Sequence, residues 1–143
     1  VIRVGTDFSV FWYDITSQNV YRLYGSASAI NGWKLISGVP VTFVPTLLNG
    51  WVNNGGGFAP AEYWKDSAGV VHIKGLIKNG NSAEGTVLFT LPVGFRPTLK
   101  ESFAVVANNA FGQVDVNDNG NVVTRRTSAA HTSLSGISFL AKE

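Results

Sequence analysis

Residues 111–126 read FGQVDVNDNGNVVTRR and predict two antiparallel strands joined by a tight turn. We expect the turn at Asn119-Gly120, because both residues tolerate the positive φ that a two-residue hairpin turn requires. Strand-forming residues flank the turn on both sides, and polar and apolar side chains alternate along them. The stretch therefore favours a β-hairpin, and with it an antiparallel fold.

The predicted turn fixes which residues face each other across the hairpin. The expected pairs are Asp118–Asn121, Asn117–Val122, Val116–Val123, Asp115–Thr124, Val114–Arg125 and Gln113–Arg126. Because side chains alternate between the faces of a strand, one face would carry Val114, Val116 and Val123, with Arg125 at its far end. The other face would carry a polar patch of Gln113, Asp115, Thr124 and Arg126. Such a patch is either a binding surface or the ordinary solvated face of an antiparallel hairpin.

The same stretch has a second interpretation as a calcium loop. Asp115, Asn117, Asn119 and Gly120 have the spacing that begins a loop of the EF-hand kind. The twelfth position of that loop needs an acid and is Arg126 here, which cannot bind a cation. The flanking residues are of the β type, so we expect no metal site, and no cofactor is predicted.

The composition of the chain limits the classes of function. Of its 143 residues 45% are hydrophobic and only 14% are charged, which favours burial of some surface in an oligomer. The net charge is +2 without a basic stripe, so we predict no binding to nucleic acid. No apolar run reaches the length of a membrane helix, so no membrane insertion is expected. The chain begins at Val1 and contains no Met, from which we expect that upstream sequence is missing.

Short apolar or alternating runs separated by Gly, Asn, Pro and Ser predict an all-β chain. The expected strands are Phe8–Ile15, Asn19–Tyr24, Leu47–Val52, Val70–Lys78, Thr86–Leu91, Ser102–Ala107, Gln113–Asn117, Asn121–Arg126 and Ser133–Ala141, with a further strand within Phe58–Trp64. The segment 41–46 is the predicted boundary between a small β module, residues 1–45, and a larger domain, residues 46–143. The eight strands of the larger domain match an antiparallel jelly-roll-like β-sandwich or barrel. Asn-Gly-Trp occurs at residues 31–33 and 49–51, and we interpret both copies as turns.

Three elements of the larger domain resemble parts of a known class of protein. They are YWKDSAGVVHIKG (residues 63–75), LPVGFRP (residues 91–97) and the closing hairpin VDVNDNGNVV (residues 114–123). In this order they resemble the C-terminal heads of receptor-binding proteins on the tails of long-tailed phages that infect Gram-positive bacteria. The likeness covers about residues 47–143, and residues 1–45 would by position be a shoulder or neck module.

The resemblance implies a location at the tail tip or baseplate of a virion and a homotrimer of jelly-roll subunits. It implies non-catalytic binding of a host cell-wall saccharide, such as a teichoic acid or a surface polysaccharide, with other tail or baseplate proteins bound through the upstream part. In such heads a His-x-Asp pair before the closing hairpin often faces the sugar. Here this position is Gln113-Val114-Asp115, so the Asp matches and Gln replaces the His.

The predicted saccharide site therefore consists of Gln113, Asp115, Thr124, Arg126 and His131, the last from the polar segment 127–133. Aromatic residues such as Trp51, Tyr63 and Trp64 could stack on sugars, but we expect them in the core or at subunit contacts. A catalytic role is not expected, because no nucleophile motif occurs and no two carboxylates are brought together by the pattern. A purely structural tail module, a wall-degrading enzyme and a jelly-roll of the tumour-necrosis or C1q type are the alternatives.

Overall fold

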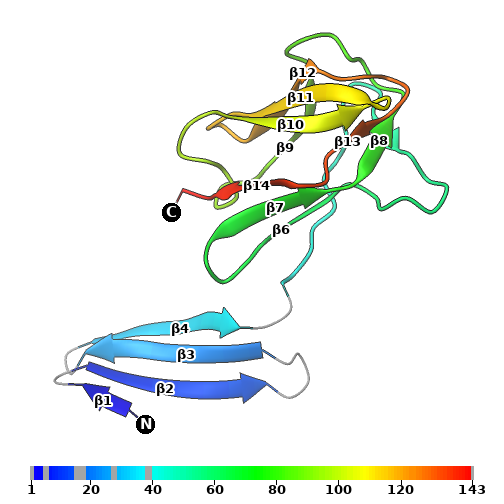
Figure 1. Ribbon diagram of the computed structural model, residues 1–143. Helices are drawn as coiled ribbons and strands as arrows, with labels where there is room; N and C mark the ends of the chain where they lie inside the picture. Colours follow the sequence, from blue (N-terminus) through cyan, green and yellow to red (C-terminus); the bar gives the residue numbers. More distant parts are fainter. Residues whose placement is uncertain (1, 5–6, 15–18, 27–28, 38–39, 143) are drawn as a thin grey trace. The chain divides into compact units, whose positions relative to one another are not determined.

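The computed structural model describes residues 2–4, 7–14, 19–26, 29–37 and 40–142. Every regular element in these ranges is a β-strand, which confirms the predicted all-β class. Contacts within the chain separate two compact units, Val1–Val41 and Thr42–Glu143. Figure 1 shows the strands of both units.

The first unit is an antiparallel sheet with the strand order β1-β2-β3-β4. Its strands are β1 (Ile2–Val4), β2 (Asp7–Asp14), β3 (Asn19–Ser26) and β4 (Ala29–Ser37). The sequence predicted β2 and β3 but not β4, because Asn31-Gly32 was interpreted as a turn. That interpretation was wrong, since Gly32 lies within β4 and pairs with Tyr24 of β3. The prediction of a turn at Asn49-Gly50 was right, because both residues have positive φ and form a turn there.

The second unit contains two antiparallel sheets (Figure 1). The larger sheet has the order β5-β8-β13-β10-β11-β12-β9, with β5 (Val52–Asn53), β8 (Leu76–Lys78), β13 (Thr132–Ser133), β10 (Glu101–Ala107), β11 (Ala110–Val116), β12 (Asn121–Arg126) and β9 (Val87–Thr90). The smaller sheet has the order β14-β7-β6, with β14 (Ile137–Leu140), β7 (Val70–Lys74) and β6 (Glu62–Lys65). Buried side chains from both sheets form one core, which includes Val71, Ile73, Leu88, Phe89, Val114, Val116, Val122, Ile137 and Phe139. The sandwich-like arrangement predicted from the strand spacing is therefore present.

Gly75 is the point at which the chain passes from the smaller sheet to the larger one. The sequence predicted one strand over 70–78, but the structure divides it into β7 and β8 at this residue. Gly75 has φ +122° and lies so close to Pro60 that an added Cβ would be 2.5 Å from the Pro60 carbonyl oxygen. Only glycine combines this conformation with this close approach.

The hairpin of β11 and β12 has a three-residue loop rather than the predicted two-residue turn. The Gly120 N–H donates to the Asn117 carbonyl and the Asn117 N–H donates to the Asn121 carbonyl, both at 2.9 Å. Gly120 has φ +93°, whereas Asn119 does not adopt positive φ. This is the type I turn followed by a left-handed residue that closes many three-residue hairpins.

The longer loop moves the register by one residue. Asp115 faces Val123 and Val114 faces Thr124, so the predicted pair of Asp115 with Thr124 was wrong. A bulge between Gln113 and Val114 then restores the predicted pair of Gln113 with Arg126. A shift of one residue transfers side chains to the opposite face of a strand, and this transfer decides which predicted site residues meet.

Candidate functional site

Asp115 is the centre of a polar cluster on β10, β11 and β12. Asp115 is only 1% exposed, yet both of its carboxylate oxygens have hydrogen-bonding or ionic partners. Oδ1 accepts hydrogen bonds from Ser102 Oγ at 2.6 Å and from Gln113 Nε2 at 3.2 Å. Oδ2 lies 2.9 Å from Lys100 Nζ and 3.1 Å from Arg125 Nε. A buried carboxylate with this many donors is stabilised in its ionised form.

Two effects compete in setting the pKa of Asp115. Burial raises the pKa, but hydrogen bonds from Ser102, Lys100 and Gln113 together outweigh burial and hold the pKa below its usual range. The folded state therefore favours the ionised carboxylate more strongly than the unfolded state does. The resulting contribution to stability is present above the unfolded-state pKa and is lost as the pH falls through the folded-state pKa.

We predict from this shift that the free energy of unfolding falls as the pH drops below about 4, the ordinary pKa of an aspartate. In an Asp115→Asn variant the side chain is an amide and takes up no proton in this pH range. The unfolding free energy of the variant should therefore fall less than that of the wild type over the same pH interval. Urea unfolding of the two proteins at a series of pH values measures the difference. Equal slopes for the two proteins would exclude Asp115 as the group that causes the loss.

The outer rim of the cluster is cationic and reaches solvent. The side chain of Lys100 is 50% exposed and that of Arg125 is 37% exposed, although both contact the buried carboxylate. Arg125 also pairs through Nη1 with Glu84 at 2.8 Å. The carboxylate fixes the positions of two positive groups that remain partly exposed. Guanidinium and ammonium groups held in this way suit phosphate or hydroxyl partners. We call the surface formed by Lys100, Gln113, Arg125 and Arg126 the cationic rim.

Arg126 extends the cationic rim along the same surface. It faces Gln113 across the hairpin, and its guanidinium carbon lies 5.9 Å from the centre of the exposed Phe111 ring. Phe111, Gln113 and Asp115 alternate along β11 and therefore share one face. The structure thus brings together Gln113, Asp115 and Arg126 of the predicted site.

Thr124 does not belong to this surface. It lies opposite Val114 on the face directed at the core, and its residue is fully buried. Its hydroxyl donates to the Ala83 carbonyl and accepts a hydrogen bond from the Thr86 N–H at 3.0 Å. The prediction that Thr124 lies beside Asp115 was wrong because of the register shift, and Arg125 takes its place.

The predicted site did not include three residues that contact Asp115, namely Lys100, Ser102 and Arg125. Arg125 was placed on the apolar face by the incorrect register. Ser102 could have been found by counting outward from Asn108-Asn109, whose positive φ values close the β10–β11 hairpin. From Ala107 opposite Ala110, that count places Ser102 opposite Asp115, as observed.

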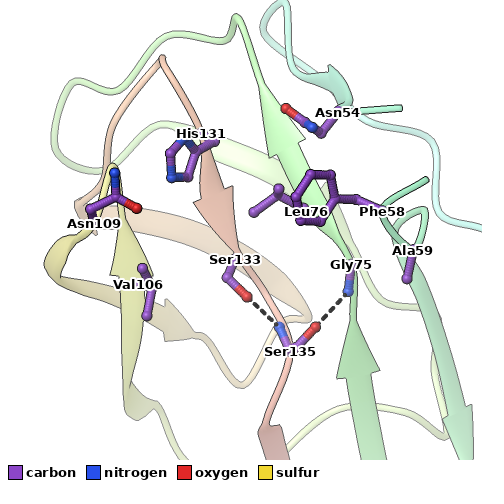
Figure 2. A pocket seen from close by; sticks show the side chains of 10 residues that line it. All are labelled: Asn54, Phe58, Ala59, Gly75, Leu76, Val106, Asn109, His131, Ser133 and Ser135. Atoms are coloured by element: carbon purple, nitrogen blue, oxygen red, sulfur yellow. Dashed lines mark hydrogen bonds between the residues drawn. The ribbon is translucent and has the colours of Figure 1, made fainter. Parts of the chain in front are cut away.

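His131 lies in a separate pocket of the second unit. The pocket has a volume of about 570 Å³ and is lined by Asn54, Phe58, Ala59, Gly75, Leu76, Val106, Asn109, His131, Ser133 and Ser135 (Figure 2). None of the residues that contact Asp115 contributes to this lining. The predicted site residues are therefore divided between the Asp115 cluster and this pocket.

The other aromatic and ionisable candidates have structural contacts. Trp51 and Tyr63 are buried in the core, as expected. Trp64 stacks on His72 with ring centres 5.1 Å apart, and His72 Nε2 lies 3.0 Å from Asp66. Among the described residues, no group of three or more His, Cys, Asp or Glu side chains is arranged to hold a metal ion. A search of the same residues finds no helix that could span a membrane.

Comparison with solved structures identifies a similar fold. The receptor binding protein (gp15) of Listeria phage PSA matches with a TM-score of 0.59 and 22% sequence identity, and the match covers 73% of this chain and 67% of that chain. Neither the comparison with protein-family models nor the comparison with curated proteins finds a match. The similarity confirms the resemblance predicted from the sequence at the level of the fold.

Proposed function

We propose that this chain is a receptor-binding protein of a phage tail, with residues 46–143 as its head and residues 1–45 as a shoulder or neck module. The observation that carries the proposal is the fold shared with the receptor binding protein of Listeria phage PSA over 73% of the chain. The order of the three sequence elements around residues 63–75, 91–97 and 114–123 supports the same assignment. A fold alone does not define a function, so the site must supply the chemistry.

The cationic rim supplies the chemistry that fits a bacterial wall polymer. Lys100 and Arg125 are oriented by Asp115 and are accessible to water. Gln113 adds an amide that can donate to or accept from a hydroxyl group. A teichoic acid combines phosphates, which pair with ammonium and guanidinium groups, with hydroxyl groups. We propose that such a polymer, or an anionic surface polysaccharide, lies across this rim and is bound without being cleaved.

Exposed apolar residues suit contacts with other protein chains. Val93, Leu99 and Leu140 are each more than half exposed, so their side chains are accessible to another protein chain. We propose that part of this surface is buried in a homotrimer, while upstream sequence contacts other tail or baseplate proteins. Three weak sites on one trimer would then act together through avidity. The same residues would also suit a purely structural tail module, which is the second candidate function.

A wall-binding assay tests the proposal. The purified chain, fluorescently labelled, is sedimented with cell walls from a panel of Gram-positive strains that includes Listeria, before and after chemical removal of the teichoic acid. We expect binding to at least one wall, loss of that binding after removal of the polymer, and no release of reducing ends. If the chain binds none of the walls, the structural module is favoured. If reducing ends are released, the chain is an enzyme.

A further inference from the structure

The pocket that contains His131 has amphiphilic walls (Figure 2). Phe58, Leu76 and Val106 supply its apolar surface, and Phe58 is 60% exposed. Asn54 contributes an amide, Asn109 a second amide and His131 an imidazole. A planar apolar surface beside a few convergent polar groups is the usual composition of a small-ligand site, and the volume of about 570 Å³ is within the usual range.

Backbone and side-chain hydrogen bonds hold the walls of the pocket in place. The Asn54 N–H donates to the Leu76 carbonyl at 2.8 Å, and the Asn108 N–H donates to the His131 carbonyl at 3.0 Å. Within the lining, the Gly75 N–H donates to Ser135 Oγ at 3.2 Å and the Ser135 N–H donates to Ser133 Oγ at 3.3 Å (Figure 2). Four separate segments of the second unit are thus fixed to one another. A site that is preformed in this way loses little conformational entropy when a ligand binds.

The charge of this pocket differs from that of the cationic rim. Its lining includes no Lys, Arg, Asp or Glu, and His131 is its one ionisable side chain among the described residues. Without a Lys or an Arg the pocket lacks the side chains that bind phosphate and carboxylate groups most strongly. Hydroxyl groups suit amides and an imidazole, which offer both donors and acceptors, and the apolar face of a sugar ring suits an aromatic side chain.

We propose that this pocket binds one neutral pyranose ring, with its apolar face on Phe58 and its hydroxyl groups toward Asn54, Asn109 and His131. This inference rests on the proposed function and extends it. The cationic rim would hold the anionic groups of a wall polymer, while the pocket would select the identity of an uncharged sugar on the same polymer or its substituents. Discrimination between hosts would then depend on the pocket more than on the rim.

Titration of the isotopically labelled chain tests the pocket directly. The probes are the methyl glycosides of glucose, galactose and rhamnose, N-acetylglucosamine, and glycerol phosphate as the anionic comparison, each at millimolar concentrations. We expect at least one neutral sugar to shift the backbone amide signals of Asn109, His131 and Ser133, with smaller effects at Ser102. Glycerol phosphate should not shift these pocket signals.

Two substitutions then test whether the sugar stacks on Phe58 or whether the loss of any exposed aromatic side chain has the same effect on binding. Phe58→Ala should weaken binding of the active sugar by about tenfold, a loss of roughly 1.4 kcal/mol. Phe111→Ala is the matched control, because Phe111 is 61% exposed but lies outside the pocket lining, and it should bind as the wild type does. Both aromatic side chains are on the surface, so neither variant removes part of the core.

Two results would overturn the inference. One is the absence of shifts in the pocket signals with every neutral sugar, and the other is equal sugar affinity of the wild type and Phe58→Ala. If either occurs while the unmodified chain still sediments with cell walls, the pocket assignment fails and the proposed function stands. If the chain binds no wall in the sedimentation assay, the proposed function itself fails.

Discussion

Alanine at both Lys100 and Arg125 should reduce binding of the chain to cell walls by about a hundredfold or more. Each of these side chains can make a charge-assisted hydrogen bond, worth about 1.5–3 kcal/mol, so that the loss of both removes about 3 kcal/mol and two factors of ten in affinity. Because the contacts are between charges on the surface, binding by the wild type should also weaken as the salt concentration rises. Sedimentation with purified walls over a range of protein concentrations gives the affinities.

The double substitution also removes two partners of the buried Asp115, so a control for folding is necessary. A Lys100→Gln, Arg125→Gln protein keeps hydrogen-bond donors near the carboxylate while removing both positive charges. It should fold and still lose most of the binding. Lys74→Ala is the matched control, since Lys74 is 42% exposed and pairs with Glu62 at 2.8 Å, but lies on β7 of the smaller sheet. Wild-type affinity of the glutamine variant would show that the cationic rim does not contact the wall.

Replacement of Gly80 by alanine should destabilise the second unit by about 3 kcal/mol, near the upper end of the usual cost of overpacking. A Cβ at this position would lie 2.1 Å from the ring of Trp51, which is itself buried in the core. The indole cannot move aside freely, because Trp51 Nε1 donates to the Asn81 carbonyl at 3.2 Å and the Asn81 N–H donates to the Asn49 carbonyl at 3.0 Å. Urea unfolding monitored by tryptophan fluorescence measures the loss.

Ser82→Ala, two residues along the same loop, is the control for Gly80→Ala. Ser82 is only partly buried, so the loss of its hydroxyl group should change the unfolding free energy by less than about 0.5 kcal/mol. An unfolding free energy of Gly80→Ala equal to that of the wild type would show that Trp51 does not occupy the observed position. Because Trp51 leads directly into β5 and Asn54, a displaced indole should also weaken sugar binding in the pocket.

Strand prediction succeeded in some segments and failed in others; of the predicted strand Leu47–Val52, only Val52 lies in a strand, β5. Residues 121–126 were predicted as a strand and form β12 with the same limits. By contrast, Asn-Gly pairs occur both in turns and inside strands, and the sequence does not distinguish Asn31-Gly32 in β4 from Asn49-Gly50 in a turn. The reason is physical, since pairing with a neighbouring strand can outweigh the local preference of Asn and Gly.

The candidate site was predictable only in part, because local residue preferences do not determine the length of the hairpin loop. Asn119-Gly120 is compatible with a loop of two residues or of three, and the choice decides whether Thr124 or Arg125 lies beside Asp115. The core settles the choice, because the observed register places Val122 and Val116 together among the buried residues. His131 and Phe58 meet through the order of β5, β8 and β13 in the larger sheet, which no local pattern specifies.

A crystal of the chain soaked with a short glycerol-phosphate oligomer that carries sugar substituents tests the cationic rim most directly. We predict a phosphate oxygen within hydrogen-bonding distance of Lys100 Nζ or the Arg125 guanidinium, on the outer face of β10, β11 and β12. Electron density for the oligomer confined to a surface away from these strands, in a chain that binds intact walls, would contradict it.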